Sequence, residues 1–191
     1  MSANLPVTIY ISAASDLMAE RETLARMVAE LPVTLAWHIA QTPVSQTDSL
    51  DTEALQVADL HFLLMGTDIR APVGLEWHMA GRFQRPSVAF LKRGVPRTPA
   101  GQVFIRDSRV DWQPFADAAD LRRQVQLVLA EHLVRHAPRY ALTPDEVIQL
   151  EALAAADTAA EQPALGEEAG HSAVILSRER YEPSEGIVLD E

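Results

Sequence analysis

The order of short apolar segments and amphipathic segments constrains the fold of this chain more than any other feature. Residues 7–11 and 60–65 are apolar and rich in β-branched, aromatic or leucine side chains, as buried strands are. Residues 16–30 and 74–84 instead repeat their apolar side chains at helical spacing. Strands and helices that alternate in this way form a parallel sheet covered on both faces. The sequence therefore predicts an α/β domain.

The remaining segments of the first half extend this pattern. Further helices are expected at residues 52–58 and 117–136, and further strands at residues 33–39, 87–91 and 103–105, which gives a sheet of four to five strands. Right-handed connections between parallel strands favour a flavodoxin-like topology for such a sheet.

Charge divides the chain into two parts. Residues 1–142 hold 15 acidic and 14 basic side chains, whereas residues 143–191 hold 12 acidic and 2 basic ones. We therefore expect a globular domain over 1–142 and a helical and acidic C-terminal extension over 143–191. Within the extension the composition predicts a helix at 143–155, a linker at 155–171 and a hairpin at 172–189.

Composition also excludes several classes of protein. The acidic extension argues against nucleic acid and membrane partners, since both attract Lys and Arg. No stretch reaches the roughly 18 to 20 apolar residues of a membrane helix, and residues 1–6 lack the pattern of a secretion signal. Without cysteine there are no disulfides, thiolate zinc sites or cysteine nucleophiles. These observations lead us to expect a cytoplasmic protein.

Histidine spacing offers little support for a metal site. His132 and His136 lie four residues apart and could share one ion. No third ligand accompanies them, so we interpret them as helix-packing residues and expect no metal.

Helical spacing places Glu76 inside the apolar arc of residues 74–84. Measured from Leu75, Met79 falls at about 40°, Phe83 at about 80° and Glu76 at about 100°. A carboxylate aimed at the sheet costs several kcal/mol unless it is paired or hydrogen-bonded, which makes Glu76 a candidate functional residue. The alternative is a glutamate in the first helical turn that only answers the helix dipole.

Glu20 and Arg21 fall within the apolar arc of residues 16–30. One interpretation is an ion pair between them that fixes the orientation of the helix. The other is that Arg21, with Ser12 and Asp16, lines a ligand pocket.

The stretch at residues 10–24, YISAASDLMAERETL, resembles the opening motif F-[IV]-S-S-T-x-x-D-L-x-x-E-R of the bacterial domain-of-unknown-function 4062 family. Residues 58–66, ADLHFLLMG, and 74–80, GLEWHMA, are similar to two further motifs of that family. The family is placed near the TIR domains and the nucleoside 2-deoxyribosyltransferases. The resemblance spans residues 7–91 and implies a TIR-like fold. It implies a catalytic role for Glu76 and ligand-binding roles for Ser12, Ala13, Asp16, Arg21 and Gly66.

Three functions follow from this resemblance. The first is a TIR-like signalling or effector module in bacterial stress signalling or antiviral defence, which acts through contacts with a separately encoded protein partner and could form a homo-oligomer. The second is an N-glycosidic hydrolase or transferase that uses Glu76 on NAD or a nucleoside. The third is a nucleotide-binding sensor. No cofactor is expected, and NAD or a nucleotide would be a ligand or substrate.

Overall fold

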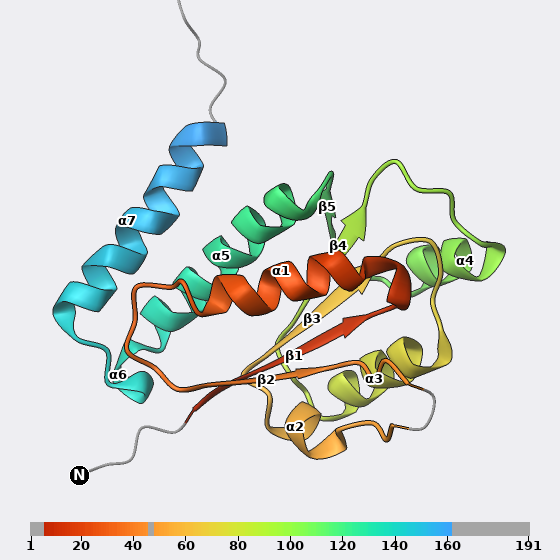
Figure 1. Ribbon diagram of the computed structural model, residues 1–191, viewed down its shortest axis with the longest axis horizontal. Coiled ribbons are helices and arrows are strands. Elements are labelled where there is room, and N and C mark those ends of the chain that lie inside the picture. The colour runs from red at the N-terminus through yellow and green to blue at the C-terminus, as the bar shows by residue number, and fades with distance from the viewer. Residues whose placement is uncertain (1–5, 46–47, 162–191) are drawn as a thin grey trace, which may run out of the picture. The chain divides into compact units, whose positions relative to one another are not determined.

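The computed structural model describes residues 6–45 and 48–161, which form an α/β fold around one parallel sheet (Figure 1). The strand order is β2-β1-β3-β4-β5, which is the flavodoxin-like order and confirms the predicted fold class. The strands are β1 (Val7–Ala13), β2 (Trp37–Gln41), β3 (Leu60–Met65), β4 (Ser87–Lys92) and β5 (Trp112–Phe115). The helices are the 3-10 helix η1 (Ser15–Leu17), α1 (Met18–Val28), α2 (Thr52–Val57), α3 (Ala71–Arg82), α4 (Pro99–Asp107), α5 (Ala118–Arg135), α6 (Ala137–Tyr140) and α7 (Pro144–Glu161).

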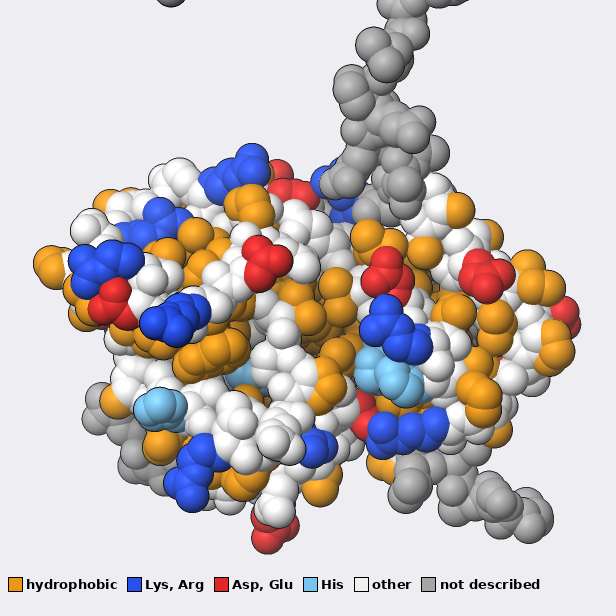
Figure 2. Space-filling view, turned by 180° about the vertical axis from the view of Figure 1, so that it is seen from behind, with side chains coloured by type: hydrophobic (Ala, Val, Ile, Leu, Met, Phe, Trp, Pro, Cys, Tyr) orange, Lys and Arg blue, Asp and Glu red, His pale blue; other side chains and the backbone are white. Residues whose placement is uncertain are grey.

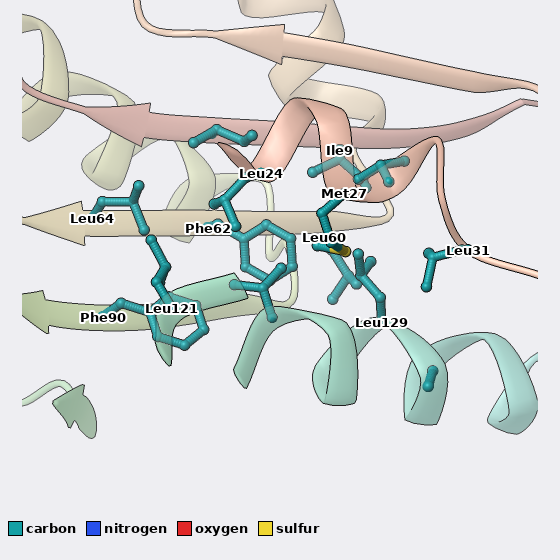
Figure 3. Close-up of a cluster of buried hydrophobic side chains, with 14 of the residues drawn as sticks. Ile9, Leu24, Met27, Leu31, Leu60, Phe62, Leu64, Phe90, Leu121 and Leu129 are labelled. Carbon is teal, nitrogen blue, oxygen red and sulfur yellow. The ribbon is translucent and has the colours of Figure 1, made fainter. Parts of the chain in front are cut away.

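One face of the sheet is covered by α1 and α5 (Figure 1). Alternate strand residues such as Ile9 and Phe62 point to this face, because successive side chains of a strand point to opposite sides. They pack against Leu24 of α1 and Leu121 of α5 (Figure 3). Because helices cover both faces, β1 and β3 are buried along their whole length.

The other face of the sheet packs against α2 and α3. Tyr10 of β1 packs in one buried cluster with Leu55 of α2 and Ala80 of α3. The same face also carries polar side chains, since His61 of β3 and Glu76 of α3 are fully buried there. The polar residues of this layer form the candidate site described below.

The predicted fifth strand at residues 103–105 is wrong, because these residues lie within α4. Thr98 caps this helix by accepting a hydrogen bond from the Gly101 amide, and Pro99 occupies its first turn. The fifth strand is instead β5, which begins only at Trp112. Two other boundaries shift: the strand expected at 33–39 is β2, and the helix expected at 74–84 is α3, which begins at Ala71.

The helix α7 packs against α5 and contributes to the main core. Leu150 of α7 is fully buried in the cluster that contains the α1 and α5 side chains. The helix begins at a capping box in which the Glu146 carboxylate accepts hydrogen bonds from the Thr143 amide and hydroxyl. Glu146 also accepts a hydrogen bond from the Thr34 amide at 2.6 Å, which ties the start of α7 to the segment before β2.

The first part of the predicted linker is also wrong, because residues 155–161 continue α7. This stretch is rich in alanine, the residue with the highest helix propensity. The rest of the linker and the hairpin predicted at 172–189 lie outside the described residues. None of the helices in the described ranges combines the length and apolar character that a membrane span requires.

Candidate functional site

A cavity of about 330 Å³ opens at the carboxyl edge of the sheet, beside the end of β1. Its walls come from the segment after β1, the segment after β2 and the start of α3. Residues that line it include Ala13, Ala14, Arg21, Thr42, Arg70 and Val73. The strand order reverses direction at β1 and β3, and ligands of open α/β sheets bind at the carboxyl ends of strands at such a point.

The carboxylate of Glu76 is fully buried and does not line this cavity, but it accepts a hydrogen bond from Thr42, which does. The Tyr10 hydroxyl donates a hydrogen bond to Glu76 Oε1 at 2.9 Å, and the Thr42 hydroxyl donates one to Oε2 at 2.6 Å. Thr42 in turn accepts a hydrogen bond from the Ala13 amide at 3.0 Å. Both carboxylate oxygens therefore have a donor, which offsets part of the cost of burial.

Arg21 supplies the positive charge of this network. Its side chain is buried, and its Nη2 donates hydrogen bonds to the Thr42 carbonyl oxygen at 2.7 Å and to Gln41 Oε1 at 2.9 Å. Burial lowers the pKa of the Arg21 guanidinium, and the nearby Glu76 carboxylate opposes this change. Arg21 thus links the end of β2 to the cavity wall.

Burial dominates the electrostatics of Glu76. It raises the pKa of the Glu76 carboxyl group, while hydrogen bonds from Thr42, Ser12 and Tyr10 and the charge of Arg21 act in the opposite direction. The pKa of the Tyr10 phenol is raised well above its usual value by burial and by the neighbouring carboxylate. The phenol therefore stays protonated and remains a hydrogen-bond donor to Glu76.

A second buried chain of polar groups crosses the same face of the sheet from β1 to β4. Ser12 Oγ lies 2.8 Å from His61 Nε2, and His61 Nδ1 lies 3.0 Å from Ser87 Oγ. Burial lowers the pKa of His61 to about 4, so the imidazole is neutral at pH 7. Ser87 Oγ also donates a hydrogen bond to the Arg85 carbonyl oxygen at 3.1 Å. Ser12 also forms a hydrogen bond with the Glu76 carboxylate, so its hydroxyl joins this chain of polar groups to the network around Glu76.

The structure brings together three of the six residues predicted for the site. Ala13 and Arg21 line the cavity, and Glu76 is joined to its wall through Thr42. Ser12 is fully buried in the chain of polar groups through His61. None of the six is far from the carboxyl edge of β1 and β3, but only Ala13 and Arg21 reach the open space.

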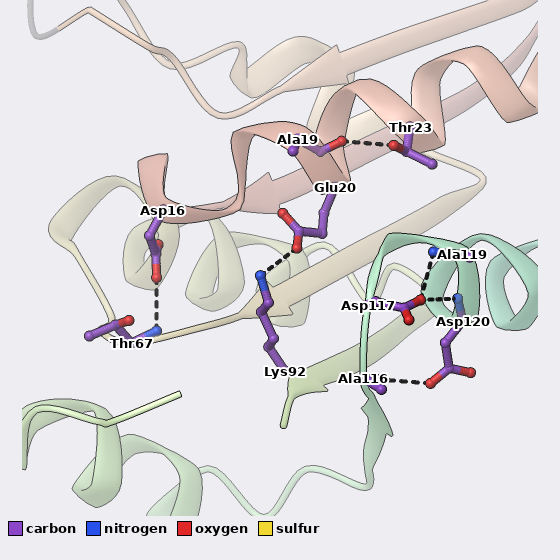
Figure 4. A network of polar contacts seen from close by, with 10 residues as sticks. All are labelled: Asp16, Ala19, Glu20, Thr23, Thr67, Lys92, Ala116, Asp117, Ala119 and Asp120. Atoms are coloured by element: carbon purple, nitrogen blue, oxygen red, sulfur yellow. Dashed lines mark hydrogen bonds and ion pairs between the residues drawn. The ribbon is translucent and has the colours of Figure 1, made fainter. Parts of the chain in front are cut away.

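Asp16 and Gly66 hold the loop that follows β3. Asp16 Oδ2 accepts a hydrogen bond from the Thr67 amide at 2.8 Å (Figure 4). A Cβ atom at position 66 would lie 2.5 Å from the same carboxylate oxygen. A larger residue at position 66 would therefore displace the Asp16 carboxylate and disturb its hydrogen bond to the Thr67 amide.

The predicted ion pair between Glu20 and Arg21 is wrong. Glu20 instead pairs with Lys92 at the end of β4, at 2.6 Å (Figure 4). Consecutive helix residues point about 100° apart, so the two side chains leave α1 in different directions. Arg21 turns toward the end of β2, where Gln41 and Thr42 accept its hydrogen bonds.

Sequence reasoning missed four residues of this region: Tyr10, Thr42, His61 and Arg70. Two of them carried a signal, because Tyr10 alternates with apolar residues in a buried strand and His61 is the only ionisable residue in the apolar run at 60–65. Thr42 and Arg70 lie in loops, where no periodicity marks a side chain as inward-facing.

His132, in the last turn of α5, packs against His136, the residue that follows the helix. Their ring centroids are 4.4 Å apart, and His136 Nδ1 donates a hydrogen bond to the His132 carbonyl oxygen. His132 Nε2 lies 3.0 Å from the Tyr140 hydroxyl oxygen, which joins α5 to α6. Across the described ranges, no three His, Asp or Glu side chains are grouped as a metal ion would require.

Comparison with known proteins finds similarity among solved structures. No family model matches the sequence, and no curated protein matches it. Among solved structures, the chain is similar to a CMP N-glycosidase, BcmB, of Clostridium botulinum, with a TM-score of 0.43 and 15% sequence identity. That similarity covers 63% of this chain and 98% of the glycosidase chain.

Proposed function

We propose that this protein is a TIR-like module that binds a nucleotide in the carboxyl-edge cavity and signals through contacts with a separate protein partner. One observation carries the binding part of the proposal. The cavity lies at the switch point of the sheet and is lined by two arginines, Arg21 and Arg70. Guanidinium groups match the geometry of phosphate oxygens and form strong charge-assisted hydrogen bonds with them.

The volume of the carboxyl-edge cavity agrees with the binding of a small molecule such as a nucleotide. Its volume of about 330 Å³ lies within the range of small-molecule sites, which is roughly 300 to 1,000 Å³. Arg21 is held in place by Gln41 and Thr42, so that little conformational entropy is lost when a phosphate binds there. Arg70 is exposed and also donates a hydrogen bond to the Ser15 hydroxyl oxygen.

The burial of Glu76 favours binding over cleavage as the first hypothesis. Attack on a ribose carbon needs the carboxylate oxygen about 3 Å from that carbon. Glu76 has no exposed surface, and Thr42 lies on the cavity wall while it donates to the carboxylate. The network around Glu76 therefore holds Thr42 in place on the cavity wall.

Isothermal titration calorimetry with AMP, CMP and NAD tests the binding proposal. We expect at least one of these ligands to bind, and we expect Arg70→Gln to weaken its binding by about tenfold, the value of one charge-assisted contact. Arg122→Gln is the matched control, because Arg122 lies on α5 and pairs with Glu30 at the surface. Absence of binding by all three ligands, or equal affinities in the Arg70→Gln and wild-type proteins, would contradict the proposal.

The second candidate function is hydrolysis or transfer at the N-glycosidic bond of a nucleoside or NAD. It is favoured by the desolvated Glu76 carboxylate and the Tyr10 hydroxyl that orients it. In this reaction the bond between ribose and the base breaks, and a carboxylate stabilises or traps the oxocarbenium-like ribose before water or a second nucleoside adds. Thr42 would have to turn away from Glu76 for substrate to reach it.

Chromatographic analysis of the same ligands after incubation with the protein separates the two functions. Release of nicotinamide or a free base would establish the glycosidic function if its rate falls by a few orders of magnitude in Glu76→Gln. Unchanged turnover in a folded Glu76→Gln protein would exclude Glu76 as the catalytic residue. If the protein binds a nucleotide without cleaving it, as the first proposal states, the ligands should remain intact while binding is measurable.

A further inference from the structure

A second and larger cavity lies at the opposite, amino edge of the sheet. Its volume is about 780 Å³, and it is enclosed by the segments before β3 and β4 and by the end of α5 with α6. Figure 2 shows histidine side chains with blue basic side chains beside them on the face seen from behind. None of the residues that line the carboxyl-edge cavity lines this one.

Positive charge predominates around the second cavity. Arg85, Arg135 and Arg139 line it together with two carboxylates, Asp59 and Glu131. Three cations against two anions leave one net positive charge, with His132 and His136 beside them. The pKa of His132 is lowered to about 4 by burial, so this ring is neutral at pH 7 and presents no charge.

Two of the three guanidinium groups are fixed before any ligand binds. Arg139 forms an ion pair with the buried Asp59 carboxylate, and its guanidinium lies 5.3 Å from the centre of the Tyr140 ring. Arg85 Nε donates a hydrogen bond to the Phe83 carbonyl oxygen at 2.9 Å. Asp59 is itself fixed, since it accepts a hydrogen bond from the Thr8 amide.

The dipole of α5 explains only part of this arrangement. A cationic residue in the last turn of a helix stabilises its carboxyl end, which accounts for Arg135. Arg85 precedes β4, and Arg139 lies in α6, so the α5 dipole does not place them here. Side chains from three elements therefore converge on one open space.

We propose that the amino-edge cavity binds a small molecule through its phosphate group, as a second site independent of the carboxyl-edge cavity. Arg85, Arg135 and Arg139 supply the hydrogen-bond donors, and guanidinium groups pair with phosphate oxygens in a bidentate manner. The negatively charged Glu131 also lines the cavity, and its repulsion of an anion limits the affinity of the site.

Calorimetric titration with inorganic pyrophosphate tests this proposal. Arg135 is exposed, and Arg135→Gln is expected to weaken pyrophosphate binding by about tenfold. Arg122→Gln, on the same helix but outside the cavity, is the control and should bind as the wild type does. Glu131→Gln removes the opposing charge and should tighten binding by about threefold, an effect that loss of structure cannot produce.

The outcome also distinguishes the two cavities. Binding weakened by Arg70→Gln but not by Arg135→Gln would place pyrophosphate at the carboxyl edge and overturn the amino-edge site. No binding at millimolar pyrophosphate, or equal affinities in the Arg135→Gln, Glu131→Gln and wild-type proteins, would overturn it as well. The protein could also bind pyrophosphate less tightly after Arg135→Gln while it binds no nucleotide at the carboxyl edge. That result would support the amino-edge site and reject the nucleotide-binding function proposed above.

Discussion

Acid should destabilise this protein through His61, and the structure gives the size of the effect. The folded state holds the imidazole neutral, with a pKa lowered from 6.5 to about 4. The unfolded state therefore takes up a proton at a higher pH than the folded state does, so stability is lost as pH falls from about 6.5 towards 4. Integrated between pH 7 and pH 5, the uptake of this proton lowers the free energy of unfolding by about 2 kcal/mol.

Urea denaturation followed by tryptophan fluorescence at pH 7 and pH 5 measures this effect. The probe is well placed, since the Trp77 ring lies 6.1 Å from the His61 ring. In His61→Gln the decrease between the two pH values should be smaller than in the wild type by about 2 kcal/mol. His132 and Glu76 also change the stability between these pH values, His132 in the same direction as His61 and Glu76 in the opposite direction. Both contribute equally to the wild type and to His61→Gln, so the difference between the two proteins reports His61 alone. An equal decrease in both proteins, or a His61 ring resonance that titrates near pH 6.5, would refute the reasoning.

Two further predictions concern packing. Leu150→Ala should lower the free energy of unfolding by about 3 kcal/mol because it leaves a cavity between α7 and the core, whereas Ile148→Ala, at a position 61% exposed, should change it by less than about 0.5 kcal/mol. Equal effects in urea denaturation would show that α7 does not pack on α5. Gly66→Ala should cost about 1 to 3 kcal/mol because its methyl group meets the Asp16 carboxylate, whereas Gly81→Ala, in open space within α3, should be neutral or stabilising by up to about 1 kcal/mol. A harmless Gly66→Ala change would contradict the close approach seen here.

The sequence was most informative where burial is uniform. The segments at 7–11 and 60–65 are strands, because two covered faces require continuously apolar residues and leave little ambiguity. The flavodoxin-like order followed from alternation and from the handedness of the connections.

Local patterns failed where tertiary context or capping decided the structure. Residues 103–105 have the composition of a short strand, but Thr98 and Pro99 start a helix that includes them. β5 was missed because Pro114 interrupts its pattern, and an edge strand tolerates proline where an interior strand does not.

The site was predictable in part for a similar reason. Helical phase correctly placed Glu76 on the buried side of α3, since that inference needs only the neighbouring residues. Its partners Tyr10 and Thr42 lie 66 and 34 residues away in the chain, and only the sheet order brings them together. The pairing of Glu20 with Lys92 depends on the same long-range geometry.

Amide chemical-shift mapping during titration with a nucleotide tests the central claim most directly. At saturating AMP or CMP, the account predicts shifts of the amides at the carboxyl edge, above all those of Ala13, Ala14, Thr42 and Val73, which line the cavity. Additional shifts near Ser87 would report the second cavity and leave the claim intact. Saturable binding that leaves the carboxyl-edge amides unmoved would contradict it.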